Sequence, residues 1–200
     1  MIKTRSICHV VQSKVDIKTW SEKTPTVDQV RPCRCVQCEA ASRPIGGHLQ
    51  IIGHGLRSRQ ILGPLAVGQA PVVVIVLVRR FLCLVCHAVM TVVPQWVVAL
   101  RLYSAAAIVL ALALRAIQRM PVDRVRSLVC PWRHAAAPRR WVMLKRWVQA
   151  VGEGRLFADQ VRVSPSRWSL EQIAARIVTS LHARGHPAAA LLGDAIAMTG

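Results

Sequence analysis

Short apolar runs separated by glycine and proline fill much of the first half of the chain, a pattern typical of β-strands. One of them, residues 72–78, is rich in β-branched side chains and has the length of a buried strand. Val89–Val93 predicts the strand that returns from it. The predicted strands are 48–52, 57–62, 72–78 and Val89–Val93, with Gly53 to Gly55 separating the first two. Residues 1–31 are polar and mixed, and we expect a flexible or loosely docked leader there.

After Pro94 the apolar positions take up helical spacing. Ser104 is a suitable N-cap for a helix over 105–119, whose apolar residues cover most of its circumference. We therefore place this helix at the centre of a small bundle. Further helices are predicted at Val122–Val129, at 138–151, from the cap Ser169 to about His182, and at 188–198. The last two are expected to pack as a C-terminal hairpin.

Seven cysteines add candidate chemistry, because four of them form two pairs with the same two-residue gap. The pairs are Cys35-Val-Gln-Cys38 and Cys83-Leu-Val-Cys86. Thiolates with this spacing converge on one tetrahedral Zn²⁺, two from each turn. The sequence thus predicts a structural zinc site and a zinc ribbon, with ordinary buried or redox cysteines as the alternative. The ribbon is unusual, since 44 residues separate the pairs and since Glu39 and His87 stand where a tight turn favours glycine.

Other cysteines and histidines lie near these pairs in the sequence. Cys33 is either a spare thiol or a partner of Cys35 or Cys38, and the equal gaps favour Cys35 with Cys38. His48, His54 and His87 are nearby substitutes, although four cysteines already complete a zinc shell. The Cys8-His9 pair is more simply incidental, and Cys130 is expected to pack in the interior.

The charge of the chain is strongly one-sided. Lys and Arg total 27 against 9 Asp and Glu, which gives a formal charge of +18. Residues 40–152 hold fifteen of these cations and one carboxylate, Asp123. This balance implies an anionic partner, most often nucleic acid, with an acidic membrane surface or simply a solvated basic face as alternatives.

The predicted third helix, 138–151, combines a basic first half with an apolar stripe formed by Trp141, Leu144, Val148 and Val151. This combination suits insertion into the major groove of DNA, and equally an ordinary amphipathic helix with a basic outer face. The residues that we expect to contact duplex DNA are Arg57, Arg59, Arg79, Arg80, Arg139, Arg140, Lys145 and Arg146.

No membrane or secretory segment is predicted. The most apolar window, residues 92–114, is interrupted by Pro94, Gln95, Arg101 and Ser104, and no apolar core follows the basic start of the chain. We expect a cytoplasmic protein whose thiols hold metal and do not form disulfides.

These patterns together predict an α+β protein in which a small β-rich zinc ribbon is followed by an α-helical bundle of helix-turn-helix type. The expected boundaries are a leader at 1–31, the ribbon at 32–94, a helical DNA-binding domain at 95–152, and the C-terminal hairpin at 153–200.

About residues 33–150 resemble the amino-terminal DNA-binding part of insertion-sequence transposases, and small transposon-associated proteins that carry a zinc ribbon and a helix-turn-helix. The matching residues are Cys35, Cys38, Gly63-Pro64, Arg79-Arg80-Phe81, Cys83, Cys86, Val93 and Pro94. The resemblance implies binding to transposon-end DNA, with zinc in a structural role.

The nine acidic residues are scattered, whereas a nuclease that transfers phosphoryl groups needs grouped carboxylates to hold Mg²⁺. No nucleophile elbow, phosphate loop or HExxH motif occurs either, so we expect no enzyme. The alternatives are a non-catalytic assembly protein, whose apolar C-terminal helices bind a transposase subunit or a second copy, and a decayed transposase fragment.

Overall fold

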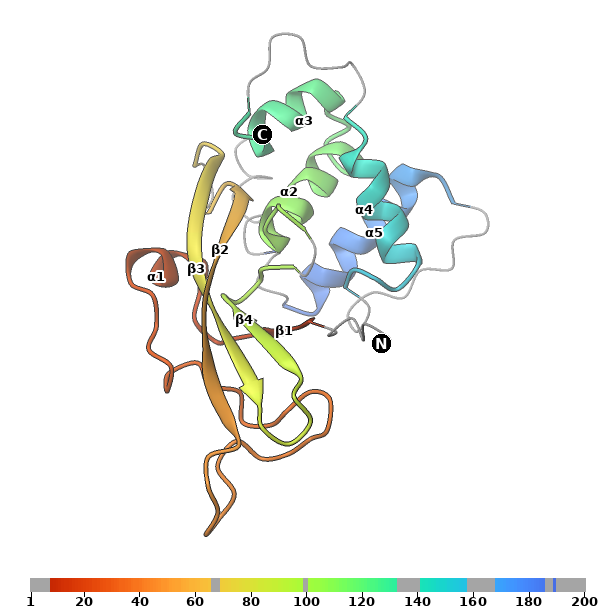
Figure 1. Cartoon of the computed structure of the whole chain (residues 1–200). Helices are drawn as coiled ribbons and strands as arrows, with labels where there is room; N and C mark the ends of the chain where they lie inside the picture. The colour runs from red at the N-terminus through yellow and green to blue at the C-terminus, as the bar shows by residue number, and fades with distance from the viewer. Residues whose placement is uncertain are drawn as a thin grey trace, which may run out of the picture. The chain divides into compact units, whose positions relative to one another are not determined.

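The computed structural model (Figure 1) describes residues 8–65, 69–98, 101–132, 141–157, 168–185 and 189. In this part of the chain it contains four strands and five α-helices, so the expected α+β class is confirmed. The strands are β1 Cys8–Gln12, β2 Ile51–Gly63, β3 Val72–Cys83 and β4 Val89–Val93. The helices are α1 Ile17–Glu22, α2 Ala105–Ala116, α3 Val122–Val129, α4 Met143–Gly152 and α5 Leu170–Ala183.

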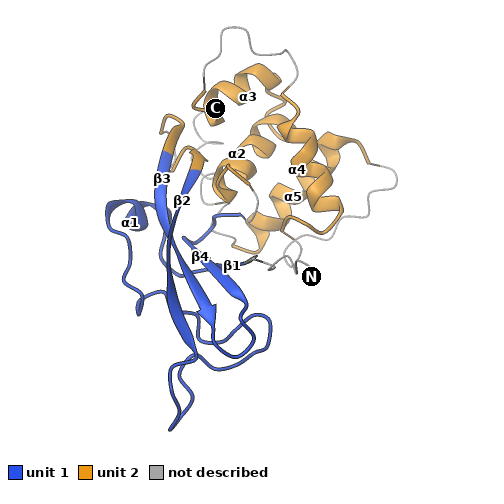
Figure 2. Cartoon of the chain, viewed as in Figure 1, with its two compact units in different colours: residues 1–60, 74–99 blue, residues 61–73, 100–200 orange. Residues whose placement is uncertain are grey.

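The chain divides into two compact units (Figure 2). The sheet unit comprises residues 1–60 and 74–99, and the helical unit comprises residues 61–73 and 100–200. The end of β2 and the start of β3 thus belong to the helical unit, although both strands run mainly in the sheet unit.

The sheet has the strand order β1-β4-β3-β2. β4 lies between a parallel neighbour, β1, and an antiparallel neighbour, β3, with Val10 opposite Thr91 and Phe81 opposite Met90. Residues 90–93 of β4 are all buried, as expected for a valine-rich strand covered on both faces. The valine-rich strand Val89–Val93 was therefore predicted with its correct bounds.

The described part of the predicted leader forms regular structure, with strand β1 and helix α1. β1 pairs with β4 along its whole length, and Trp20 of α1 is 1% exposed and donates its Nε1–H to the carbonyl of Leu77 at 2.9 Å. The polar composition of residues 8–31 did not indicate this docking. One edge strand and one tryptophan are enough to anchor the segment.

The two short strands predicted at 48–52 and 57–62 form one strand, β2, of 13 residues, which begins at Ile51 and leaves residues 48–50 outside it. Gly53 and Gly55 do not end it, even though Gly55 adopts a positive φ of 85°. β2 lies at the edge of the sheet, where an irregular residue interrupts the hydrogen bonds of one side only.

α2 is the central helix of the helical unit, as its apolar circumference predicted, and it packs against α3, α4 and α5. The Ser104 hydroxyl caps it by accepting the Ala107 N–H at 3.1 Å. Gly63 approaches the same turn closely: at its φ of 119°, a Cβ would lie 2.3 Å from the Ala107 Cβ. Only glycine fits where the end of β2 meets the start of α2.

The remaining helices follow their sequence signals in part. α3 has the predicted bounds, and α5 begins with a capping box formed by Ser169 and Gln172. α4 begins at Met143, and the predicted start of this helix at Pro138 lies outside the described residues. Apart from residue 189, so does the predicted helix 188–198.

An aromatic cluster closes this core. Tyr103, Trp141 and Trp147 meet edge to face, with ring centroids 5.1–6.2 Å apart, and Trp147 is fully buried. Within the described residues, no helix combines the length and the apolar character that crossing a membrane requires.

Candidate metal centre

The two cysteine pairs meet in the sheet unit. Their four Sγ atoms all lie within 4.8 Å of one another. Cys35 Sγ is 3.6 Å from Cys86 Sγ, and Cys38 Sγ is 3.7 Å from Cys83 Sγ. A disulfide would need about 2.05 Å, and all four residues are free cysteines. In a tetrahedral ZnS₄ site with bonds of about 2.3 Å, neighbouring sulfurs are about 3.8 Å apart. The four cysteines therefore lie close enough to hold one metal ion.

Both turns that carry the cysteines have the same hydrogen bonds. In knuckle 1, residues 34–41, Cys35 N donates to Ala40 O and Glu39 N donates to Cys35 O, both at 2.9 Å. In knuckle 2, residues 82–89, Cys83 N donates to Ala88 O at 3.0 Å and His87 N donates to Cys83 O at 2.9 Å. The sequences Cys-Val-Gln-Cys-Glu-Ala and Cys-Leu-Val-Cys-His-Ala thus fold into one backbone shape, which is what a shared tetrahedral ion needs from both sides.

The glycines that the sequence lacks are replaced by strained residues. Glu39 has a φ of 59° and His87 a φ of 61°, in the left-handed region that costs a non-glycine residue about 1–2 kcal/mol. Each knuckle keeps its tight turn at this cost. An outlier repeated at equivalent positions of two turns indicates that the site determines the backbone.

Burial and hydrogen bonding differ within each pair. Cys35 and Cys83, the first cysteines, are buried, whereas Cys38 is exposed and Cys86 is intermediate. Burial opposes ionisation of the Cys35 thiol, but hydrogen bonds from the backbone amides of Cys38 and Gln37 outweigh it and lower its pKa to about 7. The Cys35 thiol consequently ionises more easily than an ordinary cysteine thiol.

The opposite holds for Cys86. A backbone hydrogen bond from Ala88 favours its thiolate, but burial and the neighbouring thiols of Cys38, Cys35 and Cys83 outweigh that bond and raise its pKa to about 12. Thiols this close cannot all become anionic without a compensating cation. A divalent ion held by the four sulfurs would supply that compensation, and its binding would release the thiol protons.

Gln50 connects the two knuckles, a role that the sequence did not indicate. Its N–H donates to Ser42 O beside knuckle 1 at 2.9 Å, and its carbonyl accepts from Leu84 N of knuckle 2 at 2.8 Å. Both are backbone contacts, and the second joins segments far apart in the chain, so no side-chain pattern could reveal them.

The other candidate ligands stay apart from the cluster. His48, His54 and His87 are exposed, and the cluster found among the described residues consists of the four cysteines. Cys33 is also exposed and lies outside it. Cys130 is buried in the helical unit, as expected for a packing residue. The side chain of Cys8 is outside the described part.

Two of the arginines predicted to bind DNA are engaged inside the sheet unit. Arg59 donates from Nη2 to the carbonyl of Val98 at 2.6 Å, and burial, together with the charge of Arg57, lowers its pKa. Arg79 donates from Nε to the carbonyl of Pro25. These contacts fix both guanidinium groups to the backbone and leave fewer of their N–H groups for a ligand.

The other predicted contacts differ in exposure. Arg57 on the edge strand β2 is exposed, and Arg80 on β3 is partly exposed. Lys145 and Arg146 on α4 are exposed. Arg139 and Arg140 lie outside the described residues.

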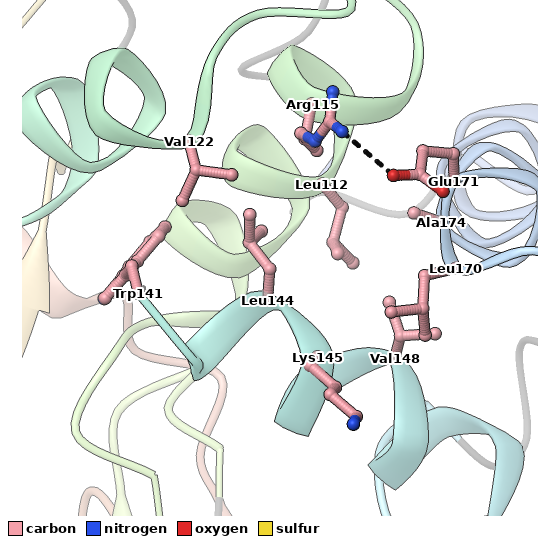
Figure 3. Close-up of a pocket in the computed structure, with 10 residues that line it drawn as sticks. All are labelled: Leu112, Arg115, Val122, Trp141, Leu144, Lys145, Val148, Leu170, Glu171 and Ala174. Carbon is pink, nitrogen blue, oxygen red and sulfur yellow. Dashed lines mark hydrogen bonds and ion pairs between the residues drawn. The ribbon is translucent and has the colours of Figure 1, made fainter. Parts of the chain in front are cut away.

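The helical unit contains an apolar hollow between α2, α4 and α5 (Figure 3). Leu112 and Leu144 face each other across it, and an ion pair of 2.9 Å between Arg115 and Glu171 lies at its margin. Lys145 lines the same hollow but extends its ammonium group away from these leucines.

Comparison of the chain with protein-family models, with curated proteins and with solved structures gave no match.

Proposed function

We propose that this protein binds DNA and that a structural Zn²⁺, held by Cys35, Cys38, Cys83 and Cys86, stabilises its sheet unit as a zinc ribbon. The observation that carries the proposal is the convergence of four sulfurs from two turns with matching hydrogen bonds. An all-thiolate, closed tetrahedral set is typical of structural zinc and leaves no open position for a substrate.

The folding of the knuckles also favours a structural ion. Between α1 and β2 the chain runs from Lys23 to Gln50 without a helix or a strand, and an isolated bridge joins Arg34 to Ala41. Structural zinc contributes about 10–16 kcal/mol of apparent binding free energy near neutral pH. That energy is available to fix a segment that has little regular structure of its own.

DNA is proposed as the ligand because of the positive charge of the sheet unit. No carboxylate occurs between Ala40 and Val122, so the arginines of β2 and β3 have no acidic neighbours in sequence. Arg57 lies on the edge strand, where its guanidinium group is exposed to a ligand. Guanidinium groups pair with phosphate oxygens in forked geometry, which suits a nucleic-acid backbone.

A metal assay tests the first half of the proposal. Purified full-length protein is expected to contain one Zn²⁺ per chain by mass spectrometry of the metal, and Cys35→Ser and Cys83→Ser are each expected to lose it. Cys33→Ser is the matched control, because that thiol is exposed and lies outside the cluster. Full zinc content in both cluster variants would refute the site.

Fluorescence anisotropy with a labelled DNA duplex at rising salt tests the second half. We expect tight binding at low salt that weakens steeply, and a salt slope reduced by about two when Arg57 and Arg80 are both replaced by Gln. Lys18→Gln, an exposed cation on α1, is the control. Absence of binding at low salt, or an affinity that does not change with salt, would reject DNA as the partner.

The helix-turn-helix arrangement, the boundaries of the predicted domains and the association with a transposable element stay predictions. Thirteen residues, 130–142, separate α3 from α4, whereas a helix-turn-helix has a turn of about 3–4 residues. We therefore propose that the DNA contacts lie mainly on the sheet unit and less on α4.

A further inference from the structure

A second polar site lies at the base of knuckle 1, in the sheet unit. It is a hollow of about 350 Å³ lined by Asp28, Arg31, Pro32, Cys33, Ser42 and Arg43. A hydrogen bond of 2.8 Å from Ser42 N to Cys33 O joins its two sides, just outside the bridge between Arg34 and Ala41. The metal centre and this hollow thus share one supporting turn.

Two guanidinium groups converge on a single oxygen in the hollow. Arg31 Nη2 and Arg43 Nη2 donate to the same Asp28 Oδ1, at 2.9 and 2.8 Å. Each guanidinium carries five N–H donors, so one carboxylate oxygen uses a small part of what the pair offers. Two positive charges face one negative charge, and a net positive charge is left to attract an anion.

Arg31 is held rigidly in place. Its side chain is 10% exposed, its Nη1 donates to the carbonyl of Ile51, and its Cζ lies 6.0 Å from the centre of the Phe81 ring. A cation fixed in this way binds an anion without losing side-chain freedom in the process. Arg43, with 66% exposure, is the mobile half of the pair.

Two buried polar atoms in the walls of the hollow have no hydrogen-bond partner: Ser42 Oγ and Arg31 Nε. Ser42 is 4% exposed. A buried polar group without a partner costs about 1–3 kcal/mol, and such groups often mark a position that a ligand completes. One is a neutral hydroxyl and the other a cationic N–H donor, and both can donate to an oxyanion.

We propose that this hollow binds a phosphate group between Arg31 and Arg43, and that the Asp28 carboxylate occupies the position of one phosphate oxygen until the phosphate displaces it. A phosphate offers more oxygens and more negative charge than the carboxylate, so it engages donors that Asp28 leaves unused. Ser42 Oγ and Arg31 Nε are unpaired donors of residues that line the hollow. The site does not require that the protein bind DNA.

Titration of the zinc-containing full-length protein with inorganic phosphate, followed by NMR of the arginine Nε–H and backbone amide signals, tests the proposal. We expect saturable shifts at Arg31, Ser42 and Arg43. Arg43→Gln is expected to weaken binding about three- to tenfold, and Asp28→Asn to tighten it by a similar factor, because the internal competitor loses its charge.

Arg34→Gln is the matched control, since it removes an exposed cation from the same knuckle but outside the hollow. Unchanged zinc content and unchanged amide spectra elsewhere show that each variant is folded. Absence of saturable shifts, or equal affinities in Arg43→Gln, Asp28→Asn and the parent protein, would overturn the proposal.

A second experiment, which compares inorganic phosphate with duplex DNA, distinguishes the two sources of the phosphate group. If Arg43→Gln weakens inorganic phosphate and duplex DNA alike, the site takes a backbone phosphate. If it weakens inorganic phosphate alone, the site takes a free phosphate group. Both results support the oxyanion site, and the second leaves it standing even where the proposed DNA binding fails.

Discussion

The sheet unit and the helical unit reach a fixed structure by different means. In the helical unit, α2 buries nearly its entire circumference against α3, α4 and α5, and aromatic rings close the core. In the sheet unit, residues 23–50 have no helix or strand, and they carry knuckle 1. Apolar burial alone can define the helical unit. In the sheet unit it defines the strands, whereas knuckle 1 relies on a few backbone hydrogen bonds and on cysteines placed far apart in the sequence.

Removal of the proposed Zn²⁺ should distinguish the two units most clearly. With a zinc chelator present, we expect residues 31–50 and 82–89 to lose protection in hydrogen exchange, while α2 keeps it. The physical reason is the loss of a binding free energy of about 10–16 kcal/mol that acts only where the ligands are. Equal loss of protection in both units would show that they are not held by separate interactions.

Trp147→Ala should produce the converse effect. Trp147 is fully buried in the helical unit, so its truncation is expected to cost about 3–5 kcal/mol there and to leave one zinc per chain in place. Denaturant unfolding followed by helical circular dichroism measures the cost. Trp132→Ala, at a position 42% exposed, is the control and should change little.

Gly63→Ala tests the junction of β2 with α2, inside the helical unit. The added Cβ would overlap the Ala107 side chain at a φ that alanine avoids, so we expect a loss of about 1–3 kcal/mol in the same unfolding assay. Gly154→Ala, at a φ of 65° but with open space around it, should lose less. Equal losses would mean that backbone strain, and not the Ala107 contact, sets the effect.

The smallest effect is expected in the knuckles. Glu39→Gly and His87→Gly should each stabilise the zinc-containing sheet unit by up to about 1 kcal/mol, because glycine adopts their positive φ without strain. Glu39→Ala keeps the strain and should not stabilise. The melting temperature of the zinc-containing protein checks this prediction, and destabilisation by glycine would argue for a role of the Glu39 or His87 side chain.

Local patterns predicted local structure well. The bounds of β4 and α3 and the caps of α2 and α5 follow from runs and cap residues that interact within a few positions. The cysteine spacing likewise identified the four residues that converge, since both pairs carry the same gap.

Contacts between distant segments were harder to predict. Three features depend on residues that no local sequence pattern identifies. They are the pairing of β1 with β4, the link through Gln50 and the burial of Arg31. The glycines in β2 wrongly suggested two separate strands. A turn signal in the sequence does not show whether an edge strand can contain an irregular residue without ending.

The separation of the knuckles along the chain also has a consequence during synthesis. Cys38 and Cys83 are 45 residues apart, and β1 pairs with a strand that begins at Val89. At roughly 5–20 residues per second, a ribosome would make the second pair of thiols about 2–9 s after the first. Over that interval the nascent chain has two of the four cysteines and a strand, β1, without its partner β4. If the cysteines hold Zn²⁺ as proposed, the timing of zinc supply during translation becomes part of how this protein matures.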